Sequence, residues 1–349
     1  MLICKCGATL ENFPKKTTQS LFFYKAATKL QSKFPAYKKC TCGYEIPAIN
    51  GVYQFTEDAP ISTDNSLQWL GYEHVGNNYE PGYFYDKAND SVGNSHNLAK
   101  FLGKGKVVLD LGAGLGGHAI SFALAELNVI AADISQVMLE HARERAQQHN
   151  AANIIYTRMN GYKLALADNS IDAVLEVDML RQVNQPDLVI SEIKRVLKPG
   201  GFLLKYGQSE SLGYTKEQEA DNDKYNTTLW DIQNYYDKQI QESGYTGRLF
   251  SSWEQAESGI KENFTPYATI KNTGLYVVNN RPWLLKMGLH KLKTKASGVK
   301  QFLPEEIHNA AWENTHAYAV SKYGAEYENI NRWFNNSSSI VAYSHITQT

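Results

Sequence analysis

The stretch KVVLDLGAGLGGH, residues 106–118, decides the fold of this chain. Its first half is a run of β-branched and leucine residues, which is typical of a strand buried on both faces of a parallel sheet. Its second half holds Gly112, Gly114 and Gly116, where a backbone without Cβ atoms can turn sharply and approach a ligand closely. The sequence continues as GHAISFALAEL, which predicts a helix. A strand, a glycine-rich turn and a helix in this order are typical of a nucleotide-binding unit.

Strand-like and helix-like segments continue from this unit to residue 206. The strands expected after the first are NVIAADI, NIIYTRM, IDAVLEV and FLLKYG. Ser135 is a candidate N-cap for the helix SQVMLEHARERAQQHN, and Pro199 followed by two glycines ends the helix DLVISEIKRVL. This pattern predicts an α/β fold with a doubly wound, Rossmann-like parallel sheet and right-handed crossovers.

Acidic residues mark the expected ligand site, because parallel sheets bind ligands at the carboxyl ends of their strands. Asp133 ends the second strand, 19 residues after Gly114, and its carboxylate can accept both hydroxyls of an adenosine ribose. Gly112, Gly114 and Gly117 also fit the GxGxxG pattern of NAD-binding domains. Asp110 argues against NAD, because a buried anion repels a pyrophosphate but suits a ligand carrying an ammonium and a sulfonium.

Four segments occur in an order and spacing that resemble class I S-adenosylmethionine (SAM)-dependent methyltransferases of the type 11/25-like group. They are LDLGAGLGG, AADIS, DNSIDAVLEV and RVLKPGGFLL, all within residues 106–206. The resemblance implies a methionine-binding end made of one acid and three glycines: Asp110, Gly112, Gly114 and Gly116. It also implies ribose and adenine contacts from four further residues: Asp133, Ile134, Asn160 and Gly161.

Two positions of this resemblance need separate comment. Asn160 stands where the family usually has an acidic residue, and its amide oxygen can accept the same hydrogen bond from the adenine amine. Glu176, at the end of the fourth strand, is expected to flank the site of methyl transfer. Either residue can instead be purely structural.

Methyl transfer from SAM is an in-line displacement, so positioning supplies much of the rate and a general base is optional. Many family members carry a histidine where this chain has Arg181 and Gln182, which removes one common base. The candidate catalytic residues are therefore His96, Tyr85 and Tyr206, while His74 and His118 are further histidines near the expected site.

All four cysteines lie in two near copies of the motif CxCG, at Cys4, Cys6, Cys40 and Cys42. Four thiolates can form a closed tetrahedral zinc site with a structural role. The spacing is one residue shorter than the usual CxxCG, and two disulfides or four free thiols are the alternatives. The chain shows no signal-peptide pattern and no long apolar run, so we expect a cytoplasmic protein without a membrane span.

The expected organisation has four parts. A zinc-knuckle-like, zinc-ribbon-like module covers residues 1–55, and a lid or linker covers 56–105. The SAM-binding domain covers 106–282, and a helical or mixed C-terminal extension at 283–349 is expected to contribute to a substrate pocket. We expect helices near 215–243 and from Glu305 to Tyr323, strands within 265–282, and a last strand or a loose tail at the end.

The acceptor of the methyl group is the open question. The 349 residues carry 35 basic and 36 acidic side chains, a net charge of −1 that gives no general attraction to nucleic acid. We therefore favour a small-molecule acceptor methylated on O, N or C. The alternatives are an RNA methyltransferase that docks through the cysteine module, and a non-enzymatic protein that binds SAM or a partner protein. The sequence does not indicate an oligomeric state.

Overall fold

The computed structural model describes most of the chain from residue 46 onward. The described residues are 46–55, 95–183, 185–206, 213–246, 253–271, 282–295, 300, 303–333 and 339–345, with the backbone of four short strands at 2–3, 9–10, 210–211 and 336–337. The four cysteines, His74 and Tyr85 lie outside these residues.

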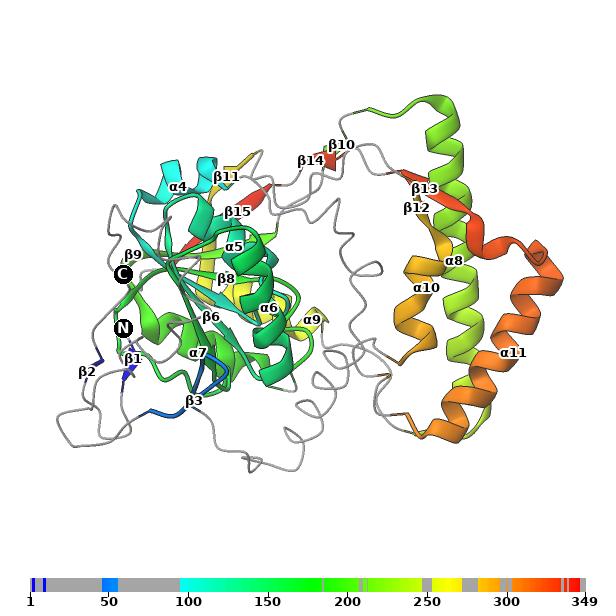
Figure 1. Cartoon of the computed structure of the whole chain (residues 1–349), viewed down its shortest axis with the longest axis horizontal. Coiled ribbons are helices and arrows are strands. Elements are labelled where there is room, and N and C mark those ends of the chain that lie inside the picture. Colours follow the sequence, from blue (N-terminus) through cyan, green and yellow to red (C-terminus); the bar gives the residue numbers. More distant parts are fainter. Residues whose placement is uncertain are drawn as a thin grey trace.

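A nine-stranded sheet forms the centre of the larger unit, seen at the left of Figure 1. Its strands, in spatial order, are β11 (Phe264–Ile270), β15 (Ile340–His345), β9 (Leu197–Tyr206), β8 (Ile171–Glu176), β5 (Val107–Leu111), β6 (Asn128–Asp133), β7 (Ile154–Arg158), β4 (Val52–Gln54) and β3 (Ala48–Ile49). All neighbours from β9 to β4 run parallel, whereas β15 is antiparallel to both β9 and β11, and β3 is antiparallel to β4. The predicted parallel α/β sheet is confirmed, and all five predicted strands are present.

The chain order of the strands creates a topological switch point at the carboxyl edge of the sheet. From β5 the chain proceeds through β6 to β7, and it then returns to β8 on the other side of β5. The carboxyl ends of β5 and β8 are therefore neighbours whose following segments diverge in opposite directions. Ligands of open α/β sheets bind in the crevice at such a switch point.

Helices cover both faces of the sheet. On one face lie α4 (His96–Leu102), α5 (Gly117–Leu124) and α6 (Gln136–Gln148), and on the other lie α7 (Pro186–Val196) and α9 (Trp253–Asn263). The alternation along β5 shows the two cores, because Val108 packs with α5 and α6 while Leu109 packs with α7 and α9. Both side chains are completely buried, and each contributes roughly 2 kcal/mol by leaving water.

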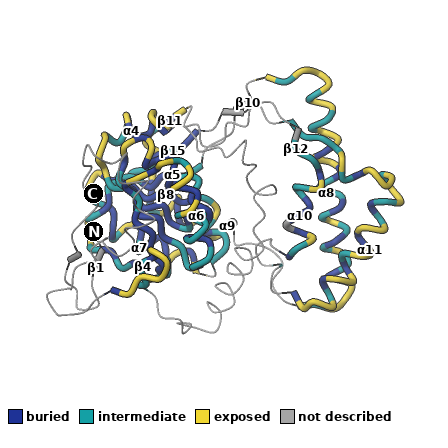
Figure 2. The backbone as a smooth tube through the Cα atoms, in the orientation of Figure 1, coloured by how far each residue is buried: buried dark blue, intermediate teal, exposed yellow. Residues whose placement is uncertain are grey.

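The second unit is helical and lies at the right of Figure 1. It consists of α8 (Lys216–Glu242), α10 (Leu285–Lys293) and α11 (Glu305–Tyr323), with the short strands β12 (Pro282–Leu284) and β13 (Asn331–Trp333). A capping box starts α8, because the side-chain oxygens of Thr215 and Gln218 each accept a hydrogen bond from the backbone amide of the other residue. The buried stripes of these helices face one another in Figure 2.

Residues on both sides of position 282 contribute to both units. Helix α8, which precedes this position, packs on α10 and α11, which follow it. Strand β15, near the end of the chain, inserts into the large sheet between β9 and β11. Hydrophobic periodicity predicts such elements individually, but it does not indicate which distant elements pair.

None of the helices within the described residues is long and apolar enough to cross a membrane.

Candidate functional site at the carboxyl edge of the sheet

The glycine-rich loop between β5 and α5 has a backbone that depends on glycine. Gly112, Gly114 and Gly116 have φ values of 77°, 50° and 73°, in the left-handed region that disfavours side chains. A Cβ atom at Gly116 would come within 2.7 Å of the Cβ of Ala142, so this glycine also lets α6 approach the loop. A Cβ atom at Gly114 would meet nothing within 4 Å, which shows that this part of the loop borders open space.

Asp110 is the least satisfied charged group in this region. Its side chain is 3% exposed, and its Oδ2 has no hydrogen-bond partner among the described residues. Burial raises the pKa of Asp110 to about 7, and the nearby Asp133 carboxylate acts in the same direction, while a backbone hydrogen bond from Ala119 opposes them. A buried carboxylate oxygen without a donor is costly unless a ligand supplies a positive charge.

Asp133 lies between the glycine-rich loop and the start of α6, and it accepts a hydrogen bond from each. Its Oδ2 accepts a hydrogen bond from the Gly114 amide at 2.8 Å, and its Oδ1 accepts one from the Ser135 amide at 2.9 Å. The predicted N-cap is present, because Ser135 Oγ accepts the Met138 amide. These bonds hold the carboxylate at the carboxyl end of β6, beside the glycine-rich loop.

The residues expected at the adenine end lie at the carboxyl ends of β6 and β7. Ile134 and Gly161 are half-buried, and the backbone carbonyl of Ile134 accepts a bond from Arg158 Nε at 3.1 Å. Asn160 is also half-buried, and its Oδ1 already accepts the Tyr162 amide at 2.9 Å. The oxygen expected to bind the adenine amine therefore has one internal partner and one lone pair left.

Glu176 lies on the opposite face of the sheet from Asp110. Side chains alternate along strands, so Glu176 shares the face of Val174, which is covered by α7 and α9, whereas Asp110 shares the face of Val108. Glu176 Oε1 accepts the Leu180 amide at 2.9 Å and supports the segment that follows β8. Burial raises the pKa of Glu176, although this hydrogen bond counteracts the shift.

The candidate catalytic residues are spread along the same edge. Tyr206 is the half-buried last residue of β9, and His96 is the exposed first residue of α4. The side chain of Asn97 donates to the carbonyl of Lys271 at 3.1 Å, which ties the start of α4 to the end of β11. Tyr85, the third candidate, lies outside the described residues.

Two residues that support the loop, the buried Arg145 and the half-buried Met179, are absent from the predicted site. Arg145 on α6 is 6% exposed, and its Nη1 donates to the carbonyl of Leu115 within the glycine-rich loop. Met179 follows β8, and its Cβ and Cγ lie 2.8 Å from where a Cβ of Gly112 would be. No local pattern identifies either residue, because both act across the sheet on a loop distant in sequence.

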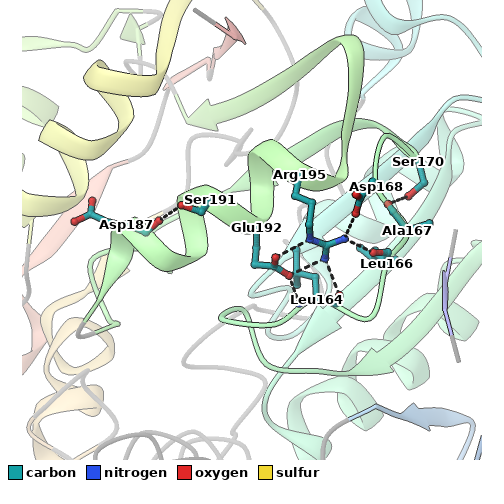
Figure 3. A network of polar contacts seen from close by, with 9 residues as sticks. All are labelled: Leu164, Leu166, Ala167, Asp168, Ser170, Asp187, Ser191, Glu192 and Arg195. Atoms are coloured by element: carbon teal, nitrogen blue, oxygen red, sulfur yellow. Dashed lines mark hydrogen bonds and ion pairs between the residues drawn. The ribbon is translucent and has the colours of Figure 1, made fainter. Parts of the chain in front are cut away.

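The Arg195 side chain of the RVLKPGG segment has a different environment, shown in Figure 3. Its guanidinium donates to both oxygens of Glu192, to Asp168 Oδ1, and to the carbonyls of Leu164 and Leu166, at 2.7–2.9 Å. All five of its N–H donors are thus used. The bonds to Glu192, and then to Asp168, raise the pKa of Arg195 further. This residue joins α7 to the loop before β8 and is structural.

The fold is a doubly wound α/β domain with a glycine-rich loop and a buried, unsatisfied carboxylate at the carboxyl edge of its sheet. Comparison with known proteins narrows this class, because residues 109–204 match the family described as "Methyltransferase domain". This segment is therefore similar to methyltransferase domains. The match covers less than half of the chain, and it includes Asp110, the glycine-rich loop and Arg195.

Individual relatives agree over the same part of the chain. A ubiquinone/menaquinone biosynthesis C-methyltransferase UbiE of Haemophilus ducreyi is 39% identical over 105 residues, which are 29% of this chain and 40% of that protein. A demethylmenaquinone methyltransferase of Renibacterium salmoninarum is 39% identical over 100 residues, with the same coverage of 29% and 40%. The chain spans about two fifths of the length of these relatives.

Among solved structures, one similar protein is a phosphoethanolamine N-methyltransferase 2 of Haemonchus contortus, in complex with phosphomonomethylethanolamine and S-adenosylhomocysteine. It is 20% identical, covers 80% of this chain and 57% of that chain, and has a TM-score of 0.36. The similarity is too low to bear on function.

Proposed function

We propose that this chain is a SAM-dependent methyltransferase that acts on a small-molecule acceptor. The observation that carries the proposal is Asp110, a buried carboxylate with one unsatisfied oxygen directly before a loop of left-handed glycines. An α-ammonium group is the kind of ligand that satisfies this oxygen and stabilises the ionised carboxylate. A dinucleotide pyrophosphate would bring a second anion to the same place.

The described residues fit SAM in the following way. Asp110 and the loop containing Gly112, Gly114 and Gly116 hold the methionine end. Asp133 holds the ribose, and three residues hold the adenine: Ile134, Asn160 and Gly161. When bound, SAM supplies an electrophilic methyl group on a good leaving group, so the chain has chiefly to orient the acceptor and exclude water.

The acceptor is proposed to be a compact molecule methylated on O, N or C. Relatives that match this domain are named as methyltransferases of quinone biosynthesis, so a quinol-type ring is the first class of acceptor to test. General bases or positioning groups are proposed at His96, Tyr85 and Tyr206. Glu176 is proposed to support the site of methyl transfer through the segment that follows β8.

The remaining assignments rest on sequence. We propose that Cys4, Cys6, Cys40 and Cys42 bind one structural zinc ion and that the protein is cytoplasmic. The proposed parts are the cysteine module at 1–55, whose hairpin joins the large sheet through β4, a lid or linker at 56–105, and the SAM-binding segment at 106–282, whose helix α8 packs in the helical unit. The extension at 283–349 is proposed to contribute to the substrate pocket, and it also supplies β15 to the large sheet.

Incubation with methyl-labelled SAM and an extract of the source cells tests the proposed activity. After separation into RNA, protein and small-molecule fractions, we expect the label in the small-molecule fraction. Label confined to RNA would contradict the acceptor class while retaining the transfer reaction. An absence of label in every fraction, together with no SAM binding by calorimetry, would contradict the proposal as a whole.

Metal analysis of the purified protein tests the zinc assignment. We expect about one zinc per chain, and we expect loss of the metal in Cys40→Ser. Folded protein without metal would remove the assignment, and it would leave the methyltransferase proposal unaffected.

A further inference from the structure

The hairpin at residues 46–55 occupies an unusual place for a segment so early in the chain. Its two strands meet at Asn50 and Gly51, whose φ values of 48° and 78° form the tight turn that Asn-Gly favours. Strand β4 then pairs in parallel with β7, and Val52 is completely buried in the sheet core. The hairpin is therefore a structural part of the methyltransferase domain.

One stripe of α6 contacts this hairpin. Gln136 Nε2 donates to the carbonyl of Ile49 at 3.1 Å, and Gln136 Oε1 accepts from Gln54 Nε2 at 2.8 Å. One turn further along the helix, Glu140 Oε1 accepts from Asn50 Nδ2 at 2.9 Å and from Gln136 at 2.6 Å. Both polar atoms of the Gln136 side chain are therefore engaged between the helix and the hairpin.

Gln136 is also part of the loop proposed to bind adenosine. It is the first residue of α6, three residues after Asp133. A second connection reaches the same loop, because the Phe55 amide donates to the carbonyl of Arg158 at 2.9 Å, and Arg158 Nε donates to the carbonyl of Ile134. The hairpin thus holds residues 134 and 136 from two directions.

We propose that the hairpin at 46–55 is a positioning element for the cofactor loop at 133–136, acting through Gln54 and Gln136. The proposal rests on the proposed function for its ligand. It assigns to Gln54, which lies outside this loop, a role in placing the Asp133 carboxylate through its hydrogen bond to Gln136. Loosening the hairpin should then weaken ligand binding without changing any group in the pocket.

The test uses the full chain and S-adenosylhomocysteine as the probe. Calorimetry compares the wild type with Gln54→Ala, Gln136→Ala and the double variant. Gln148→Ala, an exposed glutamine in the last turn of the same helix, is the matched control. Loss of one hydrogen bond should weaken binding about three- to tenfold in Gln54→Ala. The double variant should be no weaker than Gln136→Ala alone, because both substitutions break the same contact.

A second measurement separates this proposal from the proposed function. Amide hydrogen exchange of ligand-free protein reports on Gly114 and Ser135, the two donors to Asp133. We expect faster exchange at both amides in Gln54→Ala and wild-type exchange in Gln148→Ala. If the wild type fails to bind the probe, the proposed function fails, and the exchange rates still decide the positioning role. Wild-type exchange and wild-type affinity in Gln54→Ala would overturn it.

Discussion

Asp110 and Arg195 belong to two motif segments of one domain, and their surroundings are opposite. Arg195 has an acceptor for each of its five donors, and all these partners come from the protein itself. Asp110 is more deeply buried and yet has an oxygen without a donor among the described residues. A satisfied charge holds a structure together, whereas an unsatisfied buried charge marks the place where a ligand belongs.

The largest effect that would sharpen this contrast is the pH dependence of stability at Asp110. Burial raises the pKa of Asp110 to about 7 in the folded state, above its ordinary value of 3.8, so the fold favours the protonated form. The free energy of unfolding therefore falls by about 4 kcal/mol as the pH rises from about 4 to 7, because the unfolded chain loses this proton more readily than the folded one. Asp110→Asn should lack this cost, and denaturant unfolding at pH 4 and pH 7 measures the difference. A difference between wild type and variant that is equal at both pH values would contradict the account.

Removal of the fully hydrogen-bonded Arg195 should lower stability without changing ligand affinity, in contrast to substitution of Asp110. Arg195→Ala removes the guanidinium donors of Glu192 and of two carbonyls, although Glu192 keeps its bond from the Leu164 amide, so we expect a loss of about 3 kcal/mol in the free energy of unfolding. The affinity of the folded fraction for S-adenosylhomocysteine should not change. Arg195→Lys keeps the charge but cannot reproduce the forked geometry of the guanidinium. Its unfolding free energy should lie between those of the wild type and Arg195→Ala. Weakened binding by folded Arg195→Ala would show that the two segments are not independent.

A substitution at Gly112 tests how far the glycine-rich loop depends on the absence of a side chain. An alanine there must adopt a φ of 77°, and its Cβ meets Met179 at 2.8 Å, so Gly112→Ala should lose about 1–2 kcal/mol of stability. Met179→Ala in the same chain removes Cγ but keeps the Cβ that also lies 2.8 Å away, so it should restore only part of the cost of the clash and leave the backbone cost. Thermal denaturation of the single and double variants measures both parts. No recovery in the double variant would remove Met179 from the description of the site.

The smallest expected effect lies at the exposed end of the Arg195 network. Asp168 is an exposed partner, with 69% of its side chain accessible, so water replaces much of what it provides. Asp168→Asn should change the unfolding free energy by less than about 0.5 kcal/mol, which urea unfolding can bound. A loss as large as that of Arg195→Ala would show that the contact with Asp168 dominates the network.

Features that depend on a few neighbouring residues could be predicted from the sequence. The strand at 107–111, the left-handed glycines and the Ser135 cap each follow from a few neighbouring residues, and the structure contains all three. The helix from Glu305 to Tyr323 also has the predicted bounds.

Contacts between distant segments were not predictable in the same way. Gln54 meets Gln136 across 82 residues, and strand β15 pairs with β9 after the helical unit intervenes. The segment containing Arg195 is one of the four that carry the family resemblance, and the structural role of Arg195 follows from its hydrogen bonds to distant residues. The Asn-Gly sequence at 50–51 is a local signal for the hairpin, but no local signal indicates that its strand β4 pairs with β7.

The most direct test of the central claim is a calorimetric titration of S-adenosylhomocysteine into wild type, Asp110→Asn and Arg195→Lys at pH 7. Loss of a buried charge partner should weaken binding to Asp110→Asn by about 100-fold, while Arg195→Lys binds like the wild type. Equal affinity in the wild type and Asp110→Asn would contradict the claim that the unsatisfied carboxylate is the cofactor's anchor.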